Sequence, residues 1–251
     1  MEMNDSVKVS VVTVCYNSEK TIRDTIESVL NQTYSNIEYL IIDGKSADRT
    51  VEIAEEYRQA FAERGMEYII SSEKDHGIYD AMNKGTQRAT GELVGILNSD
   101  DWYEKNAVER VVDTYEKTAF DMFYADIRLI KPDGSSVVKH SRYRKYATSR
   151  DWNHPTTFVK RNIYDRFHYQ CKVVYDDWDF ILKVRNAGYK IVVLNEVLAD
   201  FRMGGASNEG GMRRALEKIK ERYTIYRQNG MSRFYLIECT VHEIAKALLK
   251  E

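Results

Sequence analysis

The sequence predicts an α/β fold, a doubly wound, Rossmann-like mixed sheet with helices on both faces. Short apolar runs rich in β-branched residues alternate with segments of helical periodicity, and each run stops at polar residues. Strands separated by helices imply right-handed crossovers and parallel neighbours. The carboxyl ends of such strands share one edge of the sheet, which is where open α/β proteins bind ligands.

Strands and helices alternate through the first hundred residues. Val7–Tyr16 is nearly all apolar, as suits a central strand covered on both faces. The helix that follows runs to about Leu30, and Ser18 is expected to be its N-cap. Further strands are expected at 37–42, 68–71 and 93–97, and further helices from Ser46 or Asp48 to about Phe61 and from Ile78 onward.

The second half of the chain predicts a hairpin, a helix on each side of it and a late strand. The expected elements are a helix at 104–117, strands at 120–130 and 135–140 around a turn at 131–134, a basic loop at 143–150, a return to the sheet at 152–158, a helix that starts within 173–179 and stops at Gly188, a strand at 189–201 and a flexible segment at 202–207.

The last forty residues have a different pattern. Apolar side chains recur at helical spacing on both sides of Asn229-Gly230, which predicts two amphipathic helices. We therefore expect a main domain at 1–210, divided into halves at 1–101 and 102–210, and a helical appendage at 211–251. Packing of the appendage on the main domain is the favoured use, and contact with a partner or an anionic membrane surface is the alternative.

The composition excludes several classes of protein. Among 251 residues, 43% are hydrophobic and 30% charged, which can support a real core. A net charge of −2 argues against a generally basic nucleic-acid binder. Three cysteines without a C-x-x-C spacing argue against a disulfide framework or zinc ribbon and fit a reducing, cytoplasmic compartment. No apolar run approaches the ~20 residues that span a bilayer.

The sharpest local signal is Asn98-Ser99-Asp100-Asp101, directly after an apolar run. Two adjacent carboxylates at the end of a buried strand are costly to desolvate unless a cation meets them. Mg²⁺ or Mn²⁺ prefers oxygen ligands and keeps positions open for substrate phosphates. Asp100 and Asp101 are therefore candidate metal ligands, and the alternative is that they only cap the next helix.

No glycine-rich phosphate loop is present. The chain has neither G-x-G-x-x-G after its first strand nor G-x-x-x-x-G-K-[ST]. A nucleotide site would have to neutralise phosphate with a metal, with Lys or Arg, or with a helix N-terminus. On the helix after Ile78, Asp80 and Lys84 share a face, which an ordinary i,i+4 ion pair would also explain.

Four segments in order resemble the glycosyltransferases of family 2, which have the GT-A fold. They are 9–17 (VSVVTVCYN), 41–50 (IIDGKSADRT), 75–85 (DHGIYDAMNKG) and 98–101 (NSDD). The resemblance runs from about Val7 to Ser207. It is greatest to bacterial enzymes that build capsule, O-antigen or other exopolysaccharide repeats.

The resemblance implies an inverting transferase that uses a nucleotide-diphosphate sugar, commonly a UDP-sugar, with Mn²⁺ or Mg²⁺. Asn98 stands where the family has the first Asp of its Asp-x-Asp motif, which leaves Asp100 and Asp101 to meet ribose and metal. The residues expected to bind the donor are Thr13, Tyr16, Asn17, Asp43, Asp75, Asp80, Asn83, Lys84, Asn98, Asp100 and Arg202.

The family's catalytic base opens a late helix, a position that matches Asp176-Asp177. We favour Asp177 as the base, with Asp176 and Asp179 as alternatives. Carboxylates at a helix N-terminus also interact well with the helix dipole, which would explain the cluster without catalysis. A carboxylate flanked by others should have a raised pKa, which suits a base. Trp152 and His154 are candidates to contact the acceptor, and His154 is a further candidate metal ligand. The alternatives are packing for Trp152 and, as the favoured interpretation, a hydrogen-bonded structural role for His154.

The expected acceptor is a saccharide or a lipid-linked oligosaccharide, which would place the enzyme on the inner face of the cytoplasmic membrane, held there by the C-terminal helices. A homodimer is left open. Two other function classes compete: a catalytically silent binding or scaffold protein on the same fold, and a nucleotidyltransferase that makes the activated sugar. The missing Gly-rich amino-terminal loop argues against the second.

Overall fold

The computed structural model describes residues 6–204 and 212–248. Its elements follow the predicted alternation. In chain order they are β1 (Val9–Cys15), α1 (Ile22–Leu30), β2 (Ile37–Asp43), α2 (Thr50–Glu55), α3 (Arg58–Glu63), β3 (Glu67–Ser72), α4 (Ile78–Arg88), β4 (Leu93–Ile96), β5 (Trp102–Tyr103), α5 (Ala107–Thr118), β6 (Met122–Ile130), β7 (Ser136–Lys139), the 3-10 helices η1 (Ser149–Asp151) and η2 (His154–Thr156), β8 (Phe158–Lys160), α6 (Arg161–Arg166), α7 (Asp176–Asn186), β9 (Ile191–Arg202), α8 (Met212–Gln228) and α9 (Tyr235–Leu248).

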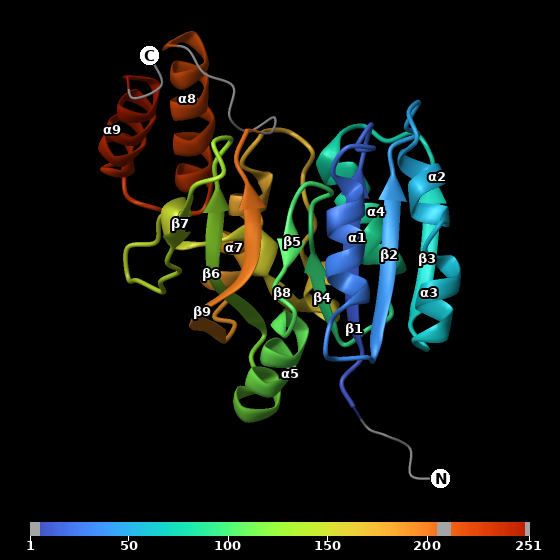
Figure 1. The fold of residues 1–251 in the computed structure, drawn as a ribbon. Coiled ribbons are helices and arrows are strands. Elements are labelled where there is room, and N and C mark those ends of the chain that lie inside the picture. Colours follow the sequence, from blue (N-terminus) through green and yellow to red (C-terminus); the bar gives the residue numbers. More distant parts are fainter. Residues whose placement is uncertain (1–5, 205–211, 249–251) are drawn as a thin grey trace.

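One mixed sheet runs through the molecule in the order β3-β2-β1-β4-β8-β6-β9-β5, with β7 paired to β6 (Figure 1). The first four strands in this order are parallel. β8 is antiparallel to both β4 and β6, β9 lies parallel to β6, and β5 is antiparallel to β9. The doubly wound mixed sheet is confirmed. It joins the two predicted halves of the main domain, because β4 of the first half pairs with β8 of the second.

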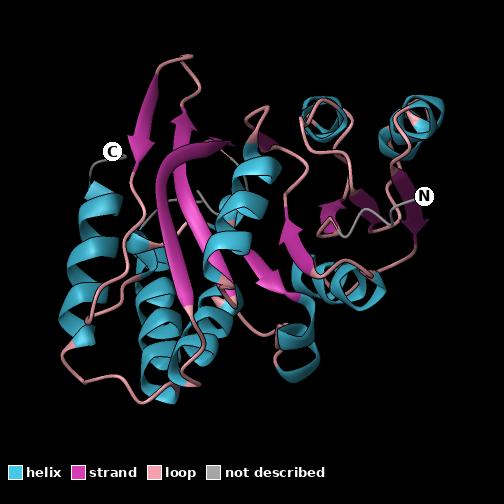
Figure 2. Ribbon diagram, turned by 90° about the horizontal axis from the view of Figure 1, so that it is seen from below, coloured by secondary structure: helices cyan, strands magenta, loops and turns pink. Residues whose placement is uncertain are grey.

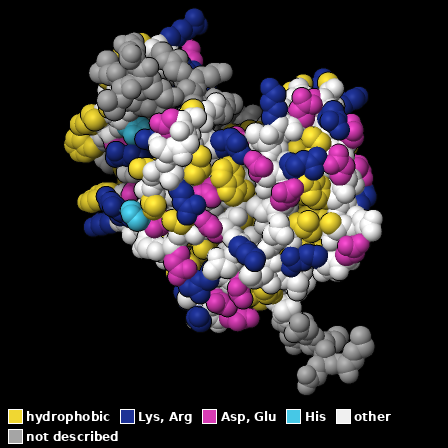
Figure 3. Space-filling view, viewed as in Figure 1, with side chains coloured by type: hydrophobic (Ala, Val, Ile, Leu, Met, Phe, Trp, Pro, Cys, Tyr) yellow, Lys and Arg dark blue, Asp and Glu magenta, His cyan; other side chains and the backbone are white. Residues whose placement is uncertain are grey.

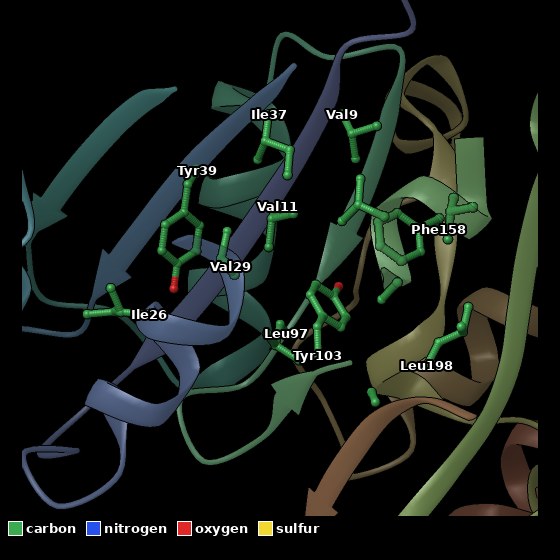
Figure 4. Close-up of a cluster of buried hydrophobic side chains, with 14 of the residues drawn as sticks. Val9, Val11, Ile26, Val29, Ile37, Tyr39, Leu97, Tyr103, Phe158 and Leu198 are labelled. Carbon is green, nitrogen blue, oxygen red and sulfur yellow. The ribbon is translucent and has the colours of Figure 1, made fainter. Parts of the chain in front are cut away.

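Helices cover both faces of the sheet, so there are two cores (Figure 2). Val9 and Val11 of β1 belong to one core and Val12 and Val14 to the other, as an extended strand buried on both sides requires. The first core contains side chains of α1, α2, α3 and α5, and Figure 4 shows Ile26 of α1 in it. The second contains side chains of α4, α6, α7, α8 and α9.

Two helix starts differ from the prediction. Ser18 does not cap α1 with its side chain, because its amide donates to Thr50 and its hydroxyl bonds Ser99. The single helix expected up to Phe61 is split into α2 and α3 around Tyr57, whose N–H bonds the carbonyl three residues back. The first difference follows from hydrogen bonds of Ser18 to distant parts of the chain, and the second from a local hydrogen bond at Tyr57.

The interpretation of Asp100-Asp101 as a helix cap is wrong. The short strand β5 follows these residues, and α5 begins only at Ala107 after Asn106. The two carboxylates thus lie in a turn between β4 and β5, at the carboxyl edge of the parallel strands.

The C-terminal helices α8 and α9 form a hairpin that packs on the main domain, as favoured. Tyr226 stacks on Tyr235 with ring centroids 4.2 Å apart, and Trp178 of α7 meets Tyr226 edge-on at 6.2 Å. In Figure 1 the hairpin stands above α7, at the edge of the sheet to which β6 and β9 point. Within the two described stretches, no helix is both long and apolar enough to cross a bilayer.

Candidate active site

Two adjoining pockets open at the carboxyl edge of the sheet. The larger, about 740 Å³, is lined by the loops after β1 and β4 and by the start of α4, and we call it the sheet-edge pocket. The smaller, about 260 Å³, lies over the start of α7 and is called the Asp177 pocket. Phe201 of β9 lines both, so the two pockets adjoin at this residue.

Asp43 organises the loops behind the sheet-edge pocket. It is fully buried and accepts hydrogen bonds from the Ser46 amide (3.0 Å) and from the hydroxyls of Ser46 and Ser72. Ser46 in turn accepts the amide of Asn17, which has a left-handed φ of 50°. The Asn17 side chain then accepts the Ala47 amide. Asp43 therefore holds Ser46, and through Ser46 the loop with Asn17, in place beside the sheet-edge pocket.

Tyr16 and Asp75 face the sheet-edge pocket from opposite loops. The Tyr16 side chain is 64% exposed, an unusual state for a large aromatic residue next to a buried strand. Asp75 accepts the Gly77 amide ahead of α4 and packs directly over Gly44, where an added Cβ would lie 2.5 Å from its Oδ2. Gly44 thus permits the close approach of these two loops.

Six of the eleven expected donor residues do not line the sheet-edge pocket: Asp43, Arg202 and the four described next. Thr13 is fully buried and accepts a hydrogen bond from the Tyr39 hydroxyl at 3.0 Å. Asp80 accepts the His76 amide, and Lys84 donates to the Lys74 carbonyl. Asn83 makes two hydrogen bonds to the backbone of Tyr169. These side chains shape the loops around α4, and none of them lines the sheet-edge pocket.

Asn98, Ser99 and Asp100 line the sheet-edge pocket at the end of β4. Ser99 bonds the Ser18 hydroxyl at 2.8 Å, which joins this turn to the loop after β1. Burial raises the pKa of Asp100. The Asn98 side-chain oxygen is buried and has no hydrogen-bond partner, so it is an acceptor without a donor in the protein.

Asp101, the second expected metal ligand, lies deeper than Asp100. Its side chain is fully buried and does not line the pocket. One oxygen accepts the Arg202 amide at 3.1 Å, the other has no partner, and burial raises its pKa well above the usual range. Asp101 is therefore a buried acid that ties the turn before β5 to the end of β9.

Arg202 lies beside Asp100 and is already engaged. Its guanidinium contacts the Asp100 carbonyl, pairs with Asp24 at 2.6 Å and lies over the Trp102 ring at 4.9 Å. The segment expected to carry it over the diphosphate continues into residues 205–207, which lie outside the described residues.

The residues around Asp100 fit a divalent cation that shares its ligands with a diphosphate. Asp100 offers one carboxylate in the pocket, and Asn98 offers an unpartnered carbonyl oxygen. Mg²⁺ is commonly held by one or two carboxylates together with substrate phosphates. Among the described residues, no three acidic, His or Cys side chains gather to hold a metal by themselves. Donor phosphates would therefore have to complete the coordination.

Asp177 lies at the start of α7 and lines the smaller pocket. One carboxylate oxygen accepts the Trp178 amide at 2.6 Å. Burial raises the pKa of Asp177 to about 7. A carboxylate with a pKa near neutral is a suitable general base, because it is ionised at working pH yet holds a proton well.

The alternatives Asp176 and Asp179 point to the other side of α7. Asp176 accepts the Lys172 amide at 2.6 Å. Asp179 accepts Asn229 and pairs with Lys183, both at 2.6 Å. Both residues line a separate pocket of about 570 Å³ between α7 and α8. Of the three acids, only Asp177 lines the pocket that adjoins the sheet edge.

Trp152 and His154 line the Asp177 pocket as well. Trp152 is 7% exposed and donates its indole N–H to Thr157. Burial lowers the pKa of His154 to about 4, so its imidazole is neutral at pH 7. The Nε2 atom of His154 is buried and has no hydrogen-bond partner.

The sequence did not indicate that the C-terminal hairpin reaches this pocket. Four charged or titratable side chains of α8 and α9 line it, namely Lys218, Arg222, His242 and Glu243. A signal was present: Arg222 falls three residues after Ile219 and four before Tyr226, on the apolar face of its helix. A charged residue on a buried face needs partners, and Arg222 finds them in Glu238 and Glu243.

Comparisons with known proteins identify the family of the chain. The family model "Glycosyl transferase family 2" matches residues 10–179. In Bacillus subtilis, the chain is 37% identical to EpsH, named as a glycosyltransferase, over 106 residues (42% of this chain and 30% of EpsH). It is 26% identical to TuaG, named as a teichuronic acid biosynthesis glycosyltransferase, over 92% of this chain and 91% of TuaG.

Solved structures show the same fold at low identity. TarS of Staphylococcus aureus (residues 1–349), in complex with UDP-GlcNAc, matches with a TM-score of 0.69 and 18% identity over 95% of this chain and 72% of that one. The mannosyltransferase PcManGT of Pyrobaculum calidifontis, in complex with GDP-Man and Mn²⁺, matches with a TM-score of 0.67 and 14% identity over 99% and 77%. Fold, strand-end residues and family model together place this chain in glycosyltransferase family 2, as an enzyme with the GT-A fold.

Proposed function

We propose that this enzyme transfers a sugar, with inversion at the anomeric carbon, from a nucleotide-diphosphate donor, a UDP-sugar, to an acceptor hydroxyl. The observation that carries the proposal is the junction of the two pockets at Phe201, with Asp100 in one and Asp177 in the other. A direct displacement needs a base on one side of the reacting carbon and stabilisation of the leaving group on the other. The two pockets offer these functions separately.

Asp177 is the proposed base. It removes the proton of the acceptor hydroxyl as the oxygen attacks the anomeric carbon and the bond from that carbon to the diphosphate breaks. Its pKa of about 7 allows ionisation near neutral pH and keeps enough basicity for proton transfer. Asp176 and Asp179 lie on the far side of α7, which supports Asp177 over both.

The sheet-edge pocket is the proposed donor site. Tyr16, Asn17 and Asp75 line it where a nucleoside would enter, and Asp43 holds their loops in place. The start of α4 lies at the same pocket, and a helix N-terminus favours negative charge. Asp100 and Asn98 would hold Mn²⁺ or Mg²⁺, which when bound stabilises charge on the departing diphosphate.

The proposed acceptor is a saccharide or a lipid-linked saccharide in the synthesis of a bacterial surface polysaccharide. The name of TuaG supports this class of pathway. The proposed location is the cytoplasm, with peripheral contact to the inner face of the membrane through α9. The exposed apolar side chains Ile237 and Val241 of α9, and Phe234 just before it, would make this contact. Figure 3 shows hydrophobic side chains at the left edge, on the side of the molecule where Figure 1 places α9.

Basic residues support a membrane contact at this face. Arg150 pairs with Glu238 of α9 at 3.4 Å, which brings the loop with the exposed Arg144 and Lys145 against the helix. Apolar insertion combined with basic residues is typical of binding to anionic bilayers. The double variant Ile237→Asp/Val241→Asp should lose sedimentation with phosphatidylglycerol vesicles, whereas Val137→Asp on β7 should keep it. Equal sedimentation of both variants would remove this contact from the proposal.

A donor screen tests the main proposal. The full chain is incubated with UDP-sugars and a glycoside acceptor, with Mn²⁺ or with EDTA, and free UDP is measured. We expect UDP release with one donor, loss of release in EDTA, and a product whose anomeric configuration by NMR is opposite to that of the donor. Retained configuration, or release that is equal in EDTA, would contradict the mechanism.

A further inference from the structure

The segment that leads into Asp177 has no helix or strand of its own. It comprises residues 167–175, all of them described, and connects α6 to α7. Backbone groups outside helices and sheets need other partners, and helix α4 supplies some of them here. The Asn83 side chain binds the backbone of Tyr169 twice, because its Nδ2 donates to the carbonyl at 2.9 Å and its Oδ1 accepts the amide at 3.0 Å.

Tyr79 of α4 holds the other end of this segment. It lies one turn before Asn83, on the same face of the helix. Its hydroxyl donates to the Val174 carbonyl at 2.8 Å, and its ring stacks on that of Tyr169 with centroids 5.4 Å apart. Two side chains of one helix therefore hold the segment near both of its ends.

The Tyr79 hydroxyl also reaches Asp177 itself. Burial, and after it the Asp177 carboxylate, raise the pKa of Tyr79, so the hydroxyl keeps its proton. Burial raises the pKa of Asp177, whereas hydrogen bonds from the Trp178 amide and the Tyr79 hydroxyl act in the opposite direction. Tyr79 thus stabilises the ionised form of Asp177, which is the form that can accept a proton.

One hydroxyl can serve both protonation states of Asp177. A tyrosine hydroxyl has one proton to donate and lone pairs that accept. Before proton transfer, Tyr79 can donate to the Asp177 carboxylate. After Asp177 has taken the proton of the acceptor hydroxyl, Tyr79 can donate to the Val174 carbonyl and accept from the protonated Asp177.

The start of α4 also borders the sheet-edge pocket. Gly77 and Ile78 line that pocket, and Tyr79 is the next residue along the chain. Three consecutive residues therefore connect the proposed donor site to the proposed base.

We infer that Tyr79 is a positioning residue for the transfer: its hydroxyl orients the Asp177 carboxylate and, together with Asn83, anchors the segment that carries Asp177 to the helix beside the sheet-edge pocket. This inference rests on the proposed function, because Asp177 is the base in that proposal. It also gives Asn83 a role at the base rather than at the donor.

Tyr79→Phe tests this role, because it removes the hydroxyl and keeps the stacked ring. With Mn²⁺ and the substrates found in the screen, kcat at pH 9 should fall by about three- to thirtyfold as the base loses its orientation. The Kd for UDP should stay the same, since Tyr79 does not line the sheet-edge pocket.

Tyr68→Phe is the matched control. The Tyr68 hydroxyl also donates to a backbone carbonyl at 2.8 Å, that of Ala54, but it belongs to β3 at the far edge of the sheet. Its removal should leave kcat and the pH profile unchanged.

The direction of the pH shift separates orientation from simple loosening. Loss of a hydrogen bond to the carboxylate raises the pKa of Asp177, so the acid limb of kcat/KM should move up by about half to one pH unit. A segment that only loosens would admit water, which weakens the effect of burial and moves the limb down. A limb that moves down or stays in place would overturn the role of the hydroxyl.

The other titratable groups around Asp177 are left in place by Tyr79→Phe. Asp176 precedes it on α7, and Tyr169 and Tyr175 belong to the connecting segment. Further groups line the Asp177 pocket from β7, η2 and the α8–α9 hairpin, namely Lys139, His154, Lys218, Arg222, His242 and Glu243. An upward shift of the acid limb therefore reports the loss of the Tyr79 hydroxyl.

A double variant tests whether Tyr79 acts through Asp177. Added to Asp177→Asn, Tyr79→Phe should change kcat by less than about twofold, because the base that it orients is already gone. A further loss as large as that in the wild-type background would reveal an independent structural role and would overturn the inference.

The outcomes separate this inference from the proposed function. If the wild-type chain releases no UDP with any donor, the proposed function fails. If it transfers sugar but Tyr79→Phe keeps the wild-type kcat and acid limb, the inference is wrong and the proposed function stands.

Asn83→Ala decides the question should Tyr79→Phe not fold, as judged by circular dichroism. It removes both bonds to Tyr169 and should lower kcat by about threefold or more in the wild-type background, but by less than about twofold in Asp177→Asn. A wild-type kcat in Asn83→Ala, or equal losses in the two backgrounds, would overturn the inference.

Discussion

At the level of single residues, the position of Asp177 leads to a clear expectation. Asp177→Asn should lower kcat by about 10²- to 10⁴-fold, the usual contribution of a general base. The Kd for UDP should stay the same, because the side chain lies in the pocket beyond Phe201. Asp176→Asn is the matched control, since its carboxylate accepts the Lys172 amide outside this pocket. A larger loss of kcat in Asp176→Asn than in Asp177→Asn would reverse the assignment.

The same residue sets the pH dependence. A base acts only when it is deprotonated, and burial raises the pKa of Asp177 to about 7. Activity should therefore fall as pH drops through about 7 and level off above pH 8, in a profile of kcat/KM against pH. In Asp177→Asn, the remaining activity should lack this limb. A wild-type profile that is flat from pH 5 to pH 8 would contradict the raised pKa.

Asp100 and Asp101 are neighbours with different expected roles. Asp100→Ala should raise the Mn²⁺ concentration needed for half-maximal UDP release by about tenfold or more, because it removes the carboxylate that lines the sheet-edge pocket beside Asn98 at the end of β4. Asp101→Asn should keep wild-type activity, since an amide oxygen can still accept the Arg202 amide. A Mn²⁺ titration of both variants checks this, and equal loss in the two would return Asp101 to the metal site.

At the level of elements, strands were easier to predict than helix starts. β1 and β2 are buried on both faces, and complete burial leaves a continuous apolar run in the sequence. The break between α2 and α3 leaves no such trace, because no Gly or Pro occurs there. It coincides with Tyr57, whose hydroxyl meets Arg23 and Glu27 of the neighbouring helix α1. Tertiary contacts of this kind are invisible in local spacing.

The loop after β2 gives a prediction of its own. Gly44→Ala would place a Cβ 2.5 Å from Asp75 Oδ2, and a flexible side-chain end can move away at small cost. We expect the donor KM to rise several-fold as Asp75 is displaced, with little change in Tm. Gly91→Ala should show the opposite pattern, a lowered Tm, because its Cβ would meet the backbone of Lys8 and Ser10 at 2.6–2.8 Å. Steady-state kinetics and thermal unfolding of both variants test this contrast.

At the level of the whole molecule, parallel topology predicts part of the lining of the sheet-edge pocket, whereas the C-terminal wall of the Asp177 pocket could not be predicted. Tyr16, Asn17 and Asp100 follow strands directly, so parallel topology alone brings them to one edge. Arg222 reaches the Asp177 pocket only because the hairpin folds back over α7. That contact joins residues far apart in the chain. An amphipathic pattern predicts that one face of a helix is buried, but it does not predict which part of the protein that face packs against.

The sharing of Phe201 between both pockets has a further consequence. Phe201 borders both the sheet-edge pocket, which is the proposed donor site, and the Asp177 pocket, which holds the proposed base. Phe201→Ala would join them into one hollow that admits water beside the activated sugar. The variant should hydrolyse a larger fraction of the donor, which is measured as the ratio of free sugar to glycoside formed. The preference for the acceptor alcohol over water would then depend on the size of one side chain.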